Sequence, residues 1–405
     1  METRPKDTPA PARRVPVARP SFDESEERLL REALRSGWVT QGPFVERFER
    51  EVAARTGARE AVAVSSGTAA LFLALHALGL GEGDEVIVPS LSFIAIANVV
   101  VHCGATPRFA EIDPRTYNLD PDSVAAAVNP RTRAILVAHQ LGLPADMEKI
   151  NAIALRHALH VIEDAACAIG ATRNDVPVGN SPNTVCFSFH PRKVVVAGEG
   201  GMITTNDPAL AQRFRRLRHQ GMSLTDLERH SMQGIVIENY SEVGYNFRLS
   251  DLHAAVGVAQ LAKLDAMLKN RREIAARYDA GLAGIDKIET PYVPENVEPN
   301  YQSYIVRFLG QSEEARNQLL NEMDRRGVAT RRGLMAIHRE PPYRDALIAG
   351  SLSETDLAAA QTLIIPMYAD LGEEDQDYVI DQLLEAVEAV PNNRDGSAAA
   401  SGMAP

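Results

Sequence analysis

Short apolar runs alternate with helical stretches through the first half of the chain. Six of these runs predict strands, at 61–66, 84–90, 107–112, 133–140, 160–166 and 184–190. Their apolar residues run together instead of strictly alternating with polar ones, which is typical of a sheet buried on both faces. Helical stretches at 67–80, 93–104 and 147–159 separate several of them. This alternation predicts an α/β fold with a mostly parallel sheet, and such sheets bind ligands at the carboxyl ends of their strands.

The regions before and after these runs have a different sequence pattern. Residues 21–57 predict helices with a break at Gly37, and a long helical stretch begins near residue 249. After it come a Pro-rich connection, a strand and further helices. We therefore expect a large α/β domain over 21–250, then a long helix and a small α+β domain over 251–391. Residues 1–20 and 392–405 predict a flexible N-terminal arm and a flexible tail.

Charge and cysteine content narrow the function classes. The formal net charge of −12 disfavours nucleic acid as a partner, because nucleic-acid-binding proteins usually carry a basic face. Cys103, Cys167 and Cys186 lack the spacing of a zinc site or a disulfide framework, so we expect no metal site and a reducing compartment. The N-terminus lacks an apolar signal segment, and no apolar run is long enough to span a bilayer. We expect a cytoplasmic protein without membrane association.

Two strand-to-helix junctions carry groups suited to a cofactor. Gly67 and Thr68 open a helix after a predicted strand, and the free N–H groups of a helix N-terminus bind phosphate. Glu163 and Asp164 end another strand, where a carboxylate can pair with a protonated pyridine nitrogen. An ordinary helix cap explains either pair equally simply when it is taken alone.

The stretch from Phe187 to Gly201 is the most informative one. An apolar strand leads through Ser188 to Lys193 and then to a glycine-rich turn. Burial among apolar side chains lowers the pKa of a lysine amine, which makes it nucleophilic and able to form a Schiff base. Ser188 is a candidate phosphate donor. A solvated surface lysine is the alternative at this point.

A fourth stretch lies just before the long helix. Asn246 and Arg248 are polar residues there without an evident local structural role. Ser250 or Asp251 would cap the helix, and capping is the alternative explanation for the polar character of this stretch.

Together and in this order, these stretches resemble the DegT and StrS group of sugar aminotransferases, which are fold-type-I enzymes dependent on pyridoxal 5′-phosphate (PLP). The resemblance runs from about residue 17 to about residue 390. It is carried by SGWVTQGPFVERFE, SSGTAALFLAL, GDEVIVPSLSF, GATPRFAEIDP, EDAACAIGA, FSFHPRK, GEGGMI and VGYNFRLSDLHAAVGVAQL. It implies a large domain with a mostly parallel seven-stranded sheet between helices, and a smaller C-terminal α+β domain. It also implies a homodimer with active sites at the subunit interface.

The resemblance assigns the chemistry to two residues. Lys193 matches the lysine that forms the internal aldimine with PLP and then moves the proton, and Asp164 matches the acid paired with the pyridine nitrogen. The remaining matches hold the cofactor. They are Gly67 and Thr68 in the phosphate-binding turn, Ser188 as the phosphate-binding serine, Phe93 as the aromatic residue stacked on the ring, Asn246 as the asparagine that reaches the phosphate from the neighbouring subunit, and Arg248, which shares that role or contacts substrate.

The chain departs from the pattern at four positions. Cys167 stands where relatives often have Gln, and Leu143 where they often have a polar residue. Val196 and Ala197 replace two threonines that many relatives carry, so a hydroxyl contact is lost there. We expect these departures to affect substrate choice and not the cofactor. Some relatives replace the lysine with His and are sugar dehydratases, and the presence of Lys193 argues against that branch.

The resemblance implies two half-reactions. An amino donor, glutamate or glutamine, leaves pyridoxamine phosphate and a 2-oxo acid, and a keto-sugar then takes up the amino group. A nucleotide-linked keto-sugar is the first expectation for the acceptor and a keto-cyclitol the second. Arg331 and Arg332 are candidates for binding a diphosphate, with His338 on the same stretch, although a solvated turn after Gly327 is an alternative. A PLP-dependent lyase or sugar dehydratase and a non-catalytic protein of the same fold are the rival functions.

Overall fold

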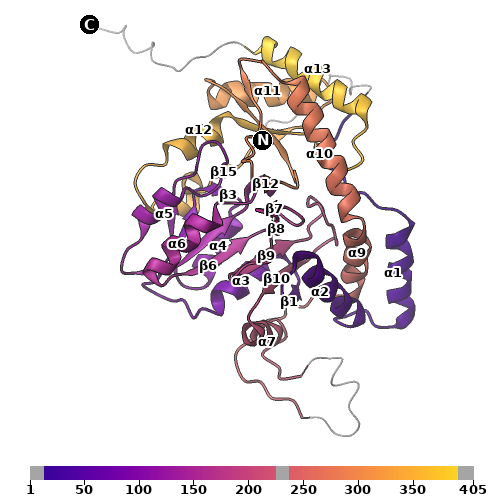
Figure 1. Cartoon of the computed structure of the whole chain (residues 1–405), viewed down its shortest axis with the longest axis vertical. Helices are drawn as coiled ribbons and strands as arrows, with labels where there is room; N and C mark the ends of the chain where they lie inside the picture. Colours follow the sequence, from indigo (N-terminus) through magenta and orange to yellow (C-terminus); the bar gives the residue numbers. More distant parts are fainter. Residues whose placement is uncertain (1–12, 225–236, 391–405) are drawn as a thin grey trace.

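A computed structural model describes residues 13–224 and 237–390. Its main sheet has strands in the order β1-β10-β9-β6-β5-β2-β4-β16 (Figure 1). These strands are β1 (Glu60–Val64), β2 (Glu85–Pro89), β4 (Thr106–Ala110), β5 (Thr132–Ala138), β6 (His160–Asp164), β9 (Thr184–Ser188), β10 (Gly201–Thr205) and β16 (Leu347–Ile348). The six strands predicted from apolar runs all form.

The sheet is mostly parallel, as expected. Strand β10 is the exception, because it pairs antiparallel with both β1 and β9. The expected seven-stranded sheet is extended to eight among the described residues. The additional strand, β16, has two residues and pairs parallel with the edge strand β4. This strand was not predicted, since so short a strand has no periodicity.

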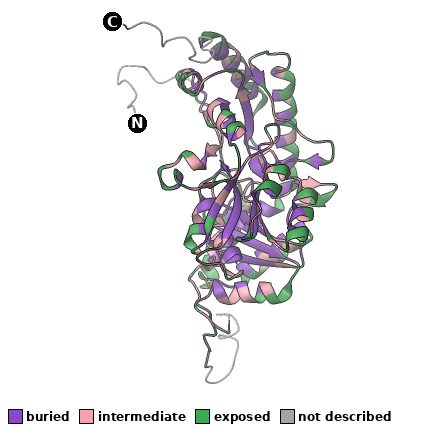
Figure 2. Cartoon of the chain, turned by 90° about the vertical axis from the view of Figure 1, so that its left-hand side faces the viewer, coloured by how far each residue is buried: buried purple, intermediate pink, exposed green. Residues whose placement is uncertain are grey.

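Helices cover both faces of this sheet. On one face lie α3 (Gly67–His76), α4 (Ala95–His102) and α7 (Pro208–Leu217). On the other lie α5 (Pro121–Ala127), α6 (Met147–His157), α2 (Pro43–Thr56) and α9 (Asp251–Ala262). Successive residues of β5 pack with helices on opposite faces. Leu136 packs with α3 and α4, whereas its neighbours Ile135 and Val137 pack with α5 and α6. Figure 2 shows the buried sheet between helices whose outer faces are exposed.

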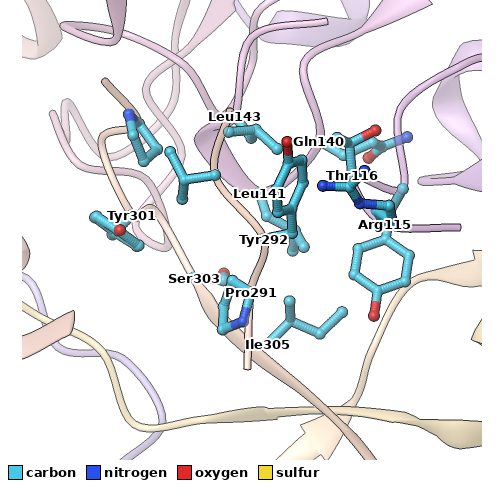
Figure 3. A pocket seen from close by; sticks show the side chains of 13 residues that line it. Arg115, Thr116, Gln140, Leu141, Leu143, Pro291, Tyr292, Tyr301, Ser303 and Ile305 are labelled. Carbon is cyan, nitrogen blue, oxygen red and sulfur yellow. The ribbon is translucent and has the colours of Figure 1, made fainter. Parts of the chain in front are cut away.

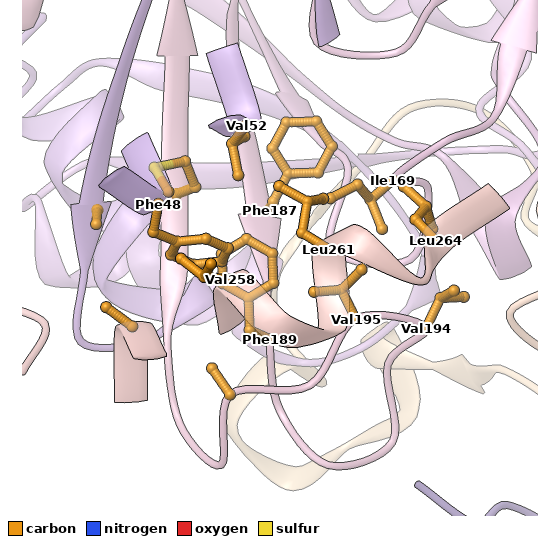
Figure 4. Close-up of a cluster of buried hydrophobic side chains, with 14 of the residues drawn as sticks. Phe48, Val52, Ile169, Phe187, Phe189, Val194, Val195, Val258, Leu261 and Leu264 are labelled. Carbon is orange, nitrogen blue, oxygen red and sulfur yellow. The ribbon is translucent and has the colours of Figure 1, made fainter. Parts of the chain in front are cut away.

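The second face is anchored by a cluster of aromatic and branched side chains (Figure 4). Phe48 of α2 and Phe189, just beyond β9, have ring centroids 4.8 Å apart. Val258 of α9 packs into the same cluster. Helix α1 (Glu24–Ser36) also contributes, through Leu29. The cluster holds the end of β9 from the face of the sheet that α2 and α9 cover. The loop that follows β9 carries Lys193.

The single long helix expected after residue 249 is instead two helices, α9 and α10 (Leu264–Gly281). Lys263 lies between them with a ψ of −1°, outside the helical range. Its ammonium lies 2.6 Å from Glu26 Oε1, and Glu26 belongs to α1. The apolar periodicity continues through Lys263, so the sequence did not indicate the break.

The C-terminal part forms the expected small α+β domain. Its antiparallel sheet has the order β11-β13-β17-β14, and three helices pack with it around one core. The elements are β11 (Ile288–Glu289), β13 (Tyr304–Phe308), β14 (Arg331–Arg332), β17 (Thr362–Ile365), α10, α11 (Glu313–Arg325) and α13 (Glu373–Ala389), with α12 (Ser353–Gln361) beside them. Figure 1 places α11 and α13 at the end of the molecule away from α7.

Short elements connect this domain to the carboxyl edge of the large sheet. Strand β15 (Met335–Ala336) pairs with β3 (Leu91–Ser92), which follows β2. Strand β12 (Val297–Glu298) pairs with β7 (Thr172–Arg173), next to β8 (Val176–Pro177). Three short 3-10 helices complete the connections: η1 (Gln140–Gly142), η2 (Ile337–Arg339) and η3 (Pro341–Tyr343).

Residues 13–20 differ from the flexible arm expected for 1–20. Val15 is 1% exposed, donates its N–H to Gly327 and accepts from Ala329, so it extends the small domain. Residues 1–12 and the predicted tail at 392–405 lie outside the described residues. The boundaries at 21–250 and 251–391 stay predictions. Within the described ranges, no helix has both the length and the apolar composition needed to cross a bilayer.

Candidate active site

Asp164 ends β6 on the face of the sheet that α3 covers. Its register partner on β9 is Cys186, which packs with the side chains of α3. Burial raises the pKa of Asp164, although the N–H of Ala166, 3.0 Å from Oδ1, and the charge of Lys193 act in the opposite direction. A carboxylate in this position gains from a cationic partner.

Glu163, the neighbouring acid, points to the opposite face of the sheet, where its hydrogen-bond partners lie. His139 Nδ1 accepts the N–H of Ala145, so the imidazole proton lies on Nε2 and is donated to Glu163 Oε2 at 3.0 Å. Asn183 and Ser181 also donate to this carboxylate. Burial would raise the pKa of Glu163, but these hydrogen bonds outweigh burial and hold the pKa below its usual range. Glu163 is therefore a satisfied core residue behind the end of β6.

Lys193 lies on the loop after β9, which is the strand next to β6. Its Nζ donates to Cys167 Sγ at 3.2 Å, and Cys167 is on the turn that follows Asp164. The predicted pair, Lys193 and Asp164, is thus brought together at adjacent strand ends. Val196 and Ala197, after the lysine, are each 1% exposed, so these departures from the family pattern belong to the core.

The turn between β1 and α3 lies against the end of β9. Ser66 caps α3 by accepting the N–H of Ala69 at 3.1 Å, which leaves the N–H groups of Gly67 and Thr68 ahead of the helical ladder. A Cβ added to Gly67 would lie 2.8 Å from Ser188 Cβ, so the turn and Ser188 are in direct contact. A Cβ on Gly201 would lie only 2.4 Å from the Ser66 carbonyl oxygen. The glycines allow this approach and form an N–H and hydroxyl cradle suited to phosphate.

No contact among the described residues of the single chain shows a cofactor role for the other three predicted residues, Phe93, Asn246 and Arg248. Phe93, between β3 and α4, is 63% exposed, and Asn246 is also exposed. The Arg248 guanidinium is hydrogen-bonded to His219 Nδ1. The single chain leaves Phe93 and Asn246 facing solvent, and their cofactor contacts stay predictions.

The other three predicted substrate residues lie in different places. Arg331, in β14, is partly buried; its Nε is buried without a hydrogen-bond partner, and Nη2 reaches Ser303 Oγ at 3.4 Å. Burial and the nearby charge of Arg192 lower its pKa, with an opposing effect of Cys167, so Arg331 lies near the Lys193 loop. Arg332 is exposed. His338 has both ring nitrogens engaged, at 2.5 Å from Ser90 Oγ and 3.1 Å from Asp356, which favours a structural role.

A polar segment of the small domain, not predicted from the sequence, contacts both the turn after Asp164 and the loop that carries Lys193. Asn300 Nδ2 donates to the carbonyls of Cys167 and Ile169 at 2.8 and 2.9 Å, and Gln302 Nε2 donates to the Arg192 carbonyl at 2.8 Å. Both lie at the end of the Pro-rich connection, where no periodicity or motif indicates a side chain's direction.

Beside this segment is a small cavity lined by Tyr301, Ser303, Leu141 and the pair Arg115 and Tyr292 (Figure 3). The Arg115 guanidinium lies 3.5 Å from the centroid of the Tyr292 ring. The cavity volume is about 30 Å³. Such a volume holds one or two water molecules. A sugar does not fit in a volume of this size.

Comparisons with known proteins agree with this arrangement. The model of the DegT/DnrJ/EryC1/StrS aminotransferase family matches residues 20–384. The chain belongs to this family. It is 38% identical over 380 residues to the spore coat polysaccharide biosynthesis protein SpsC of Bacillus subtilis, covering 92% of this chain and 97% of SpsC. It is 39% identical over 376 residues to GDP-perosamine synthase of Caulobacter vibrioides, covering 92% and 98%.

Solved structures give the same fold. The PLP form of Spr1654 from Streptococcus pneumoniae superposes with a TM-score of 0.87 at 27% identity, covering 93% of this chain and 100% of that one. Family membership confirms the expected fold and makes the chain a PLP-dependent sugar aminotransferase. The residues present fit PLP, since an N–H and hydroxyl cradle, a buried carboxylate and a lysine amine converge at one edge of the sheet. The role of each residue stays a prediction.

Proposed function

We propose that this enzyme transfers an amino group from glutamate or glutamine to a keto-sugar, in the first instance a nucleotide-linked one, and that Lys193 binds PLP. The convergence of three elements carries the proposal. Lys193 after β9, Asp164 at the end of β6 and the N-terminus of α3 meet on one side of the sheet. They correspond to three of the polar parts of the cofactor: aldehyde, ring nitrogen and phosphate.

Each group has a defined task in this proposal. The N–H groups of Gly67 and Thr68 and the Ser188 hydroxyl donate to the phosphate. Asp164 stabilises positive charge on the ring nitrogen, and that charge in turn lowers the pKa that burial raises. PLP supplies an electron sink for the pair of electrons left when a C–H bond breaks. Lys193 Nζ takes the proton from the α-carbon of the donor and would deliver it to C4′ of the cofactor, so that the nitrogen stays with the cofactor.

The surroundings of Lys193 favour anionic substrates. Arg331 and Arg192 both lie close to this loop, in a protein with a net charge of −12. Arg331 is partly buried, and a guanidinium there carries the charge that pairs with a carboxylate or phosphate. Amino-acid donors carry a carboxylate and nucleotide-linked sugars carry a diphosphate. The name of the Caulobacter relative, GDP-perosamine synthase, refers to a nucleotide-linked sugar and supports that acceptor class.

We include in the proposal a homodimer with active sites at the subunit interface. Phe93 and Asn246, expected beside the cofactor, are exposed in the single chain. A second copy that supplies Asn246 to this site and covers Phe93 would account for both exposures. A cytoplasmic location is proposed on the cysteine content alone.

Absorbance of the PLP-loaded enzyme tests the substrates. Glutamate or glutamine should convert the visible band of lysine-bound PLP into the near-ultraviolet band of the amine form of the cofactor. A nucleotide-linked keto-sugar should then restore the visible band. Restoration by a keto-cyclitol alone would move the acceptor to that class. Elimination of water from the sugar without transfer of nitrogen would contradict the proposal and favour a dehydratase.

A further inference from the structure

Asn300 connects the small domain to the turn that follows Asp164. Its side chain is fully buried, and Nδ2 donates to the carbonyls of Cys167 and Ile169 at 2.8 and 2.9 Å. Its Oδ1 lies where a Cβ on Gly142 would fall, at 1.8 Å, so Gly142 must be glycine for Asn300 to fit. One amide therefore fixes the turn whose Cys167 Sγ lies beside Lys193 Nζ.

Gln302 connects the same segment to the lysine loop. Its side chain is 7% exposed, and Nε2 donates to the carbonyl of Arg192 at 2.8 Å. That carbonyl belongs to the peptide bond that joins Arg192 to Lys193. The hydrogen bond therefore restrains the backbone at the base of the lysine side chain.

The segment that presents both amides is itself held in place. Asn300 Oδ1 accepts the N–H of Gln302 at 2.9 Å, and the buried Arg271 donates to the carbonyl of Tyr301 at 2.9 Å. Tyr301, which lines the cavity in Figure 3, has a φ of 47°. A left-handed conformation is unfavourable for a bulky residue and persists where surrounding contacts impose it. The surrounding hydrogen bonds therefore determine where the two amides point.

We infer that Asn300 and Gln302 are positioning residues for the amino transfer: Asn300 fixes the turn beneath the lysine amine, and Gln302 fixes the peptide that carries Lys193. The inference rests on the role proposed for Lys193. Misplacing a reacting group by about 1 Å costs roughly a hundredfold in rate. Loss of one of these hydrogen bonds should therefore lower the rate of proton transfer more than it lowers donor affinity.

The chain offers a matched control. Gln361 is also 7% exposed, and its Nε2 donates to a backbone carbonyl, that of Gln311, at 3.2 Å. This second glutamine lies in the same small domain and has no hydrogen bond to the Lys193 loop among those of the described residues. Replacing either glutamine with Met keeps the side-chain length and removes the donor, together with an amide oxygen that accepts from Ser303 in Gln302 and from Arg307 in Gln361.

The experiment compares Gln302→Met, Gln361→Met and wild type, each loaded with PLP. The rate of conversion to the amine form is measured against glutamate concentration, with the thermal midpoint of each variant. We expect Gln302→Met to lower the limiting rate about tenfold or more with little change in the half-saturating glutamate concentration. We expect Gln361→Met to lower the midpoint comparably and to leave the limiting rate unchanged.

Equal limiting rates for Gln302→Met and wild type would overturn the inference, and so would equal losses in the two Met variants. If Gln302→Met does not fold, Gln302→Leu takes its place, because its side chain is smaller and also lacks the donor. Failure of both Gln302 variants to fold while Gln361→Met folds would make the role structural and would overturn the inference too. A wild type that no amino donor converts would instead contradict the proposed function.

Discussion

Two adjacent carboxylates, Glu163 and Asp164, meet opposite environments because successive side chains of a strand point to opposite faces. Glu163 receives hydrogen bonds from His139, Ser181 and Asn183, and its pKa is held below the usual range despite burial. Burial raises the pKa of Asp164, which has few compensating donors. A carboxyl group left in this condition at a strand end is a candidate for binding a cation.

Asp164→Asn tests this assignment in the enzyme and in the PLP-free protein. The variant should lose about a hundredfold or more in amino-transfer rate, since the amide cannot stabilise a protonated ring nitrogen. The folded PLP-free wild type binds the Asp164 proton more tightly than the unfolded chain does. Stability from this group is therefore lost as pH rises from the unfolded to the folded pKa.

The Asp164→Asn variant has no carboxyl group at this position, so it does not lose stability in this way as pH rises. Its PLP-free form should therefore be at least as stable as wild type above the folded pKa of Asp164, as measured by thermal unfolding across a pH series. A variant that keeps full activity would refute the pairing with the ring nitrogen. A PLP-free wild type that gains stability over the variant as pH rises would refute the burial argument.

Sequence reasoning located residues whose signals are local. Lys193 and Ser188 were found because an apolar strand leads directly into them, and Gly67 because it opens a helix. Asn300 and Gln302 were missed because what distinguishes them is contact with loops more than 100 residues away in the sequence. Nothing within the Pro-rich connection indicates such contacts, since their direction depends on how the two domains pack.

At the scale of elements, apolar runs predicted strands correctly where the runs were long and had clear ends. All six predicted strands form, but β10 was not located because a glycine-rich turn precedes it and polar threonines end it. The break between α9 and α10 was missed for a different reason. The periodicity runs unchanged through Lys263, so the sequence pattern does not indicate the break, and the structure places the Lys263 ammonium beside Glu26 of another helix.

The contact between the α3 turn and β9 predicts the effect of a single methyl group. Gly67→Ala would place a Cβ 2.8 Å from Ser188 Cβ and separate the two halves of the phosphate cradle. We expect the dissociation constant for PLP, measured by fluorescence or absorbance titration, to rise about tenfold or more. Gly81→Ala is the control, because a Cβ there meets nothing within 4 Å. Unchanged PLP affinity in Gly67→Ala would show that the turn does not bind the phosphate.

At the scale of the whole molecule, the C-terminal part of the chain completes the large domain. Strand β16 extends its sheet, β15 pairs beside Phe93, and the Tyr343 hydroxyl is 2.5 Å from Asn98 Oδ1. Helix α9 packs in the core on the other face. Elements that follow residue 250 in the sequence therefore pack with the large domain in space, and the boundary near residue 250 stays a prediction. The sequence pattern indicated two different regions, but it could not indicate that elements of the second region pack with the large domain.

The proposed dimer makes a prediction for mixed subunits. Lys193→Ala and Asn246→Ala should each be nearly inactive as homodimers. Mixing and reassembling them in equal amounts should restore about one quarter of wild-type activity, because half of the dimers are mixed and each mixed dimer has one intact site. Activity that stays at the level of the separate variants would place Asn246 in its own subunit's site or outside any site.

The most direct measurement is the absorbance spectrum of the Lys193→Ala variant with PLP, before and after addition of glutamate or glutamine. Lys149→Ala serves as the control, because this lysine side chain is 71% exposed and lies on α6. Wild type and the control should show the visible band of lysine-bound PLP and convert it to the near-ultraviolet band of the amine form. Lys193→Ala should bind PLP without that lysine-dependent band and should lose amino transfer by about a thousandfold or more. A Lys193→Ala variant that retains both the band and its conversion would contradict the assignment of Lys193 as the cofactor-binding lysine.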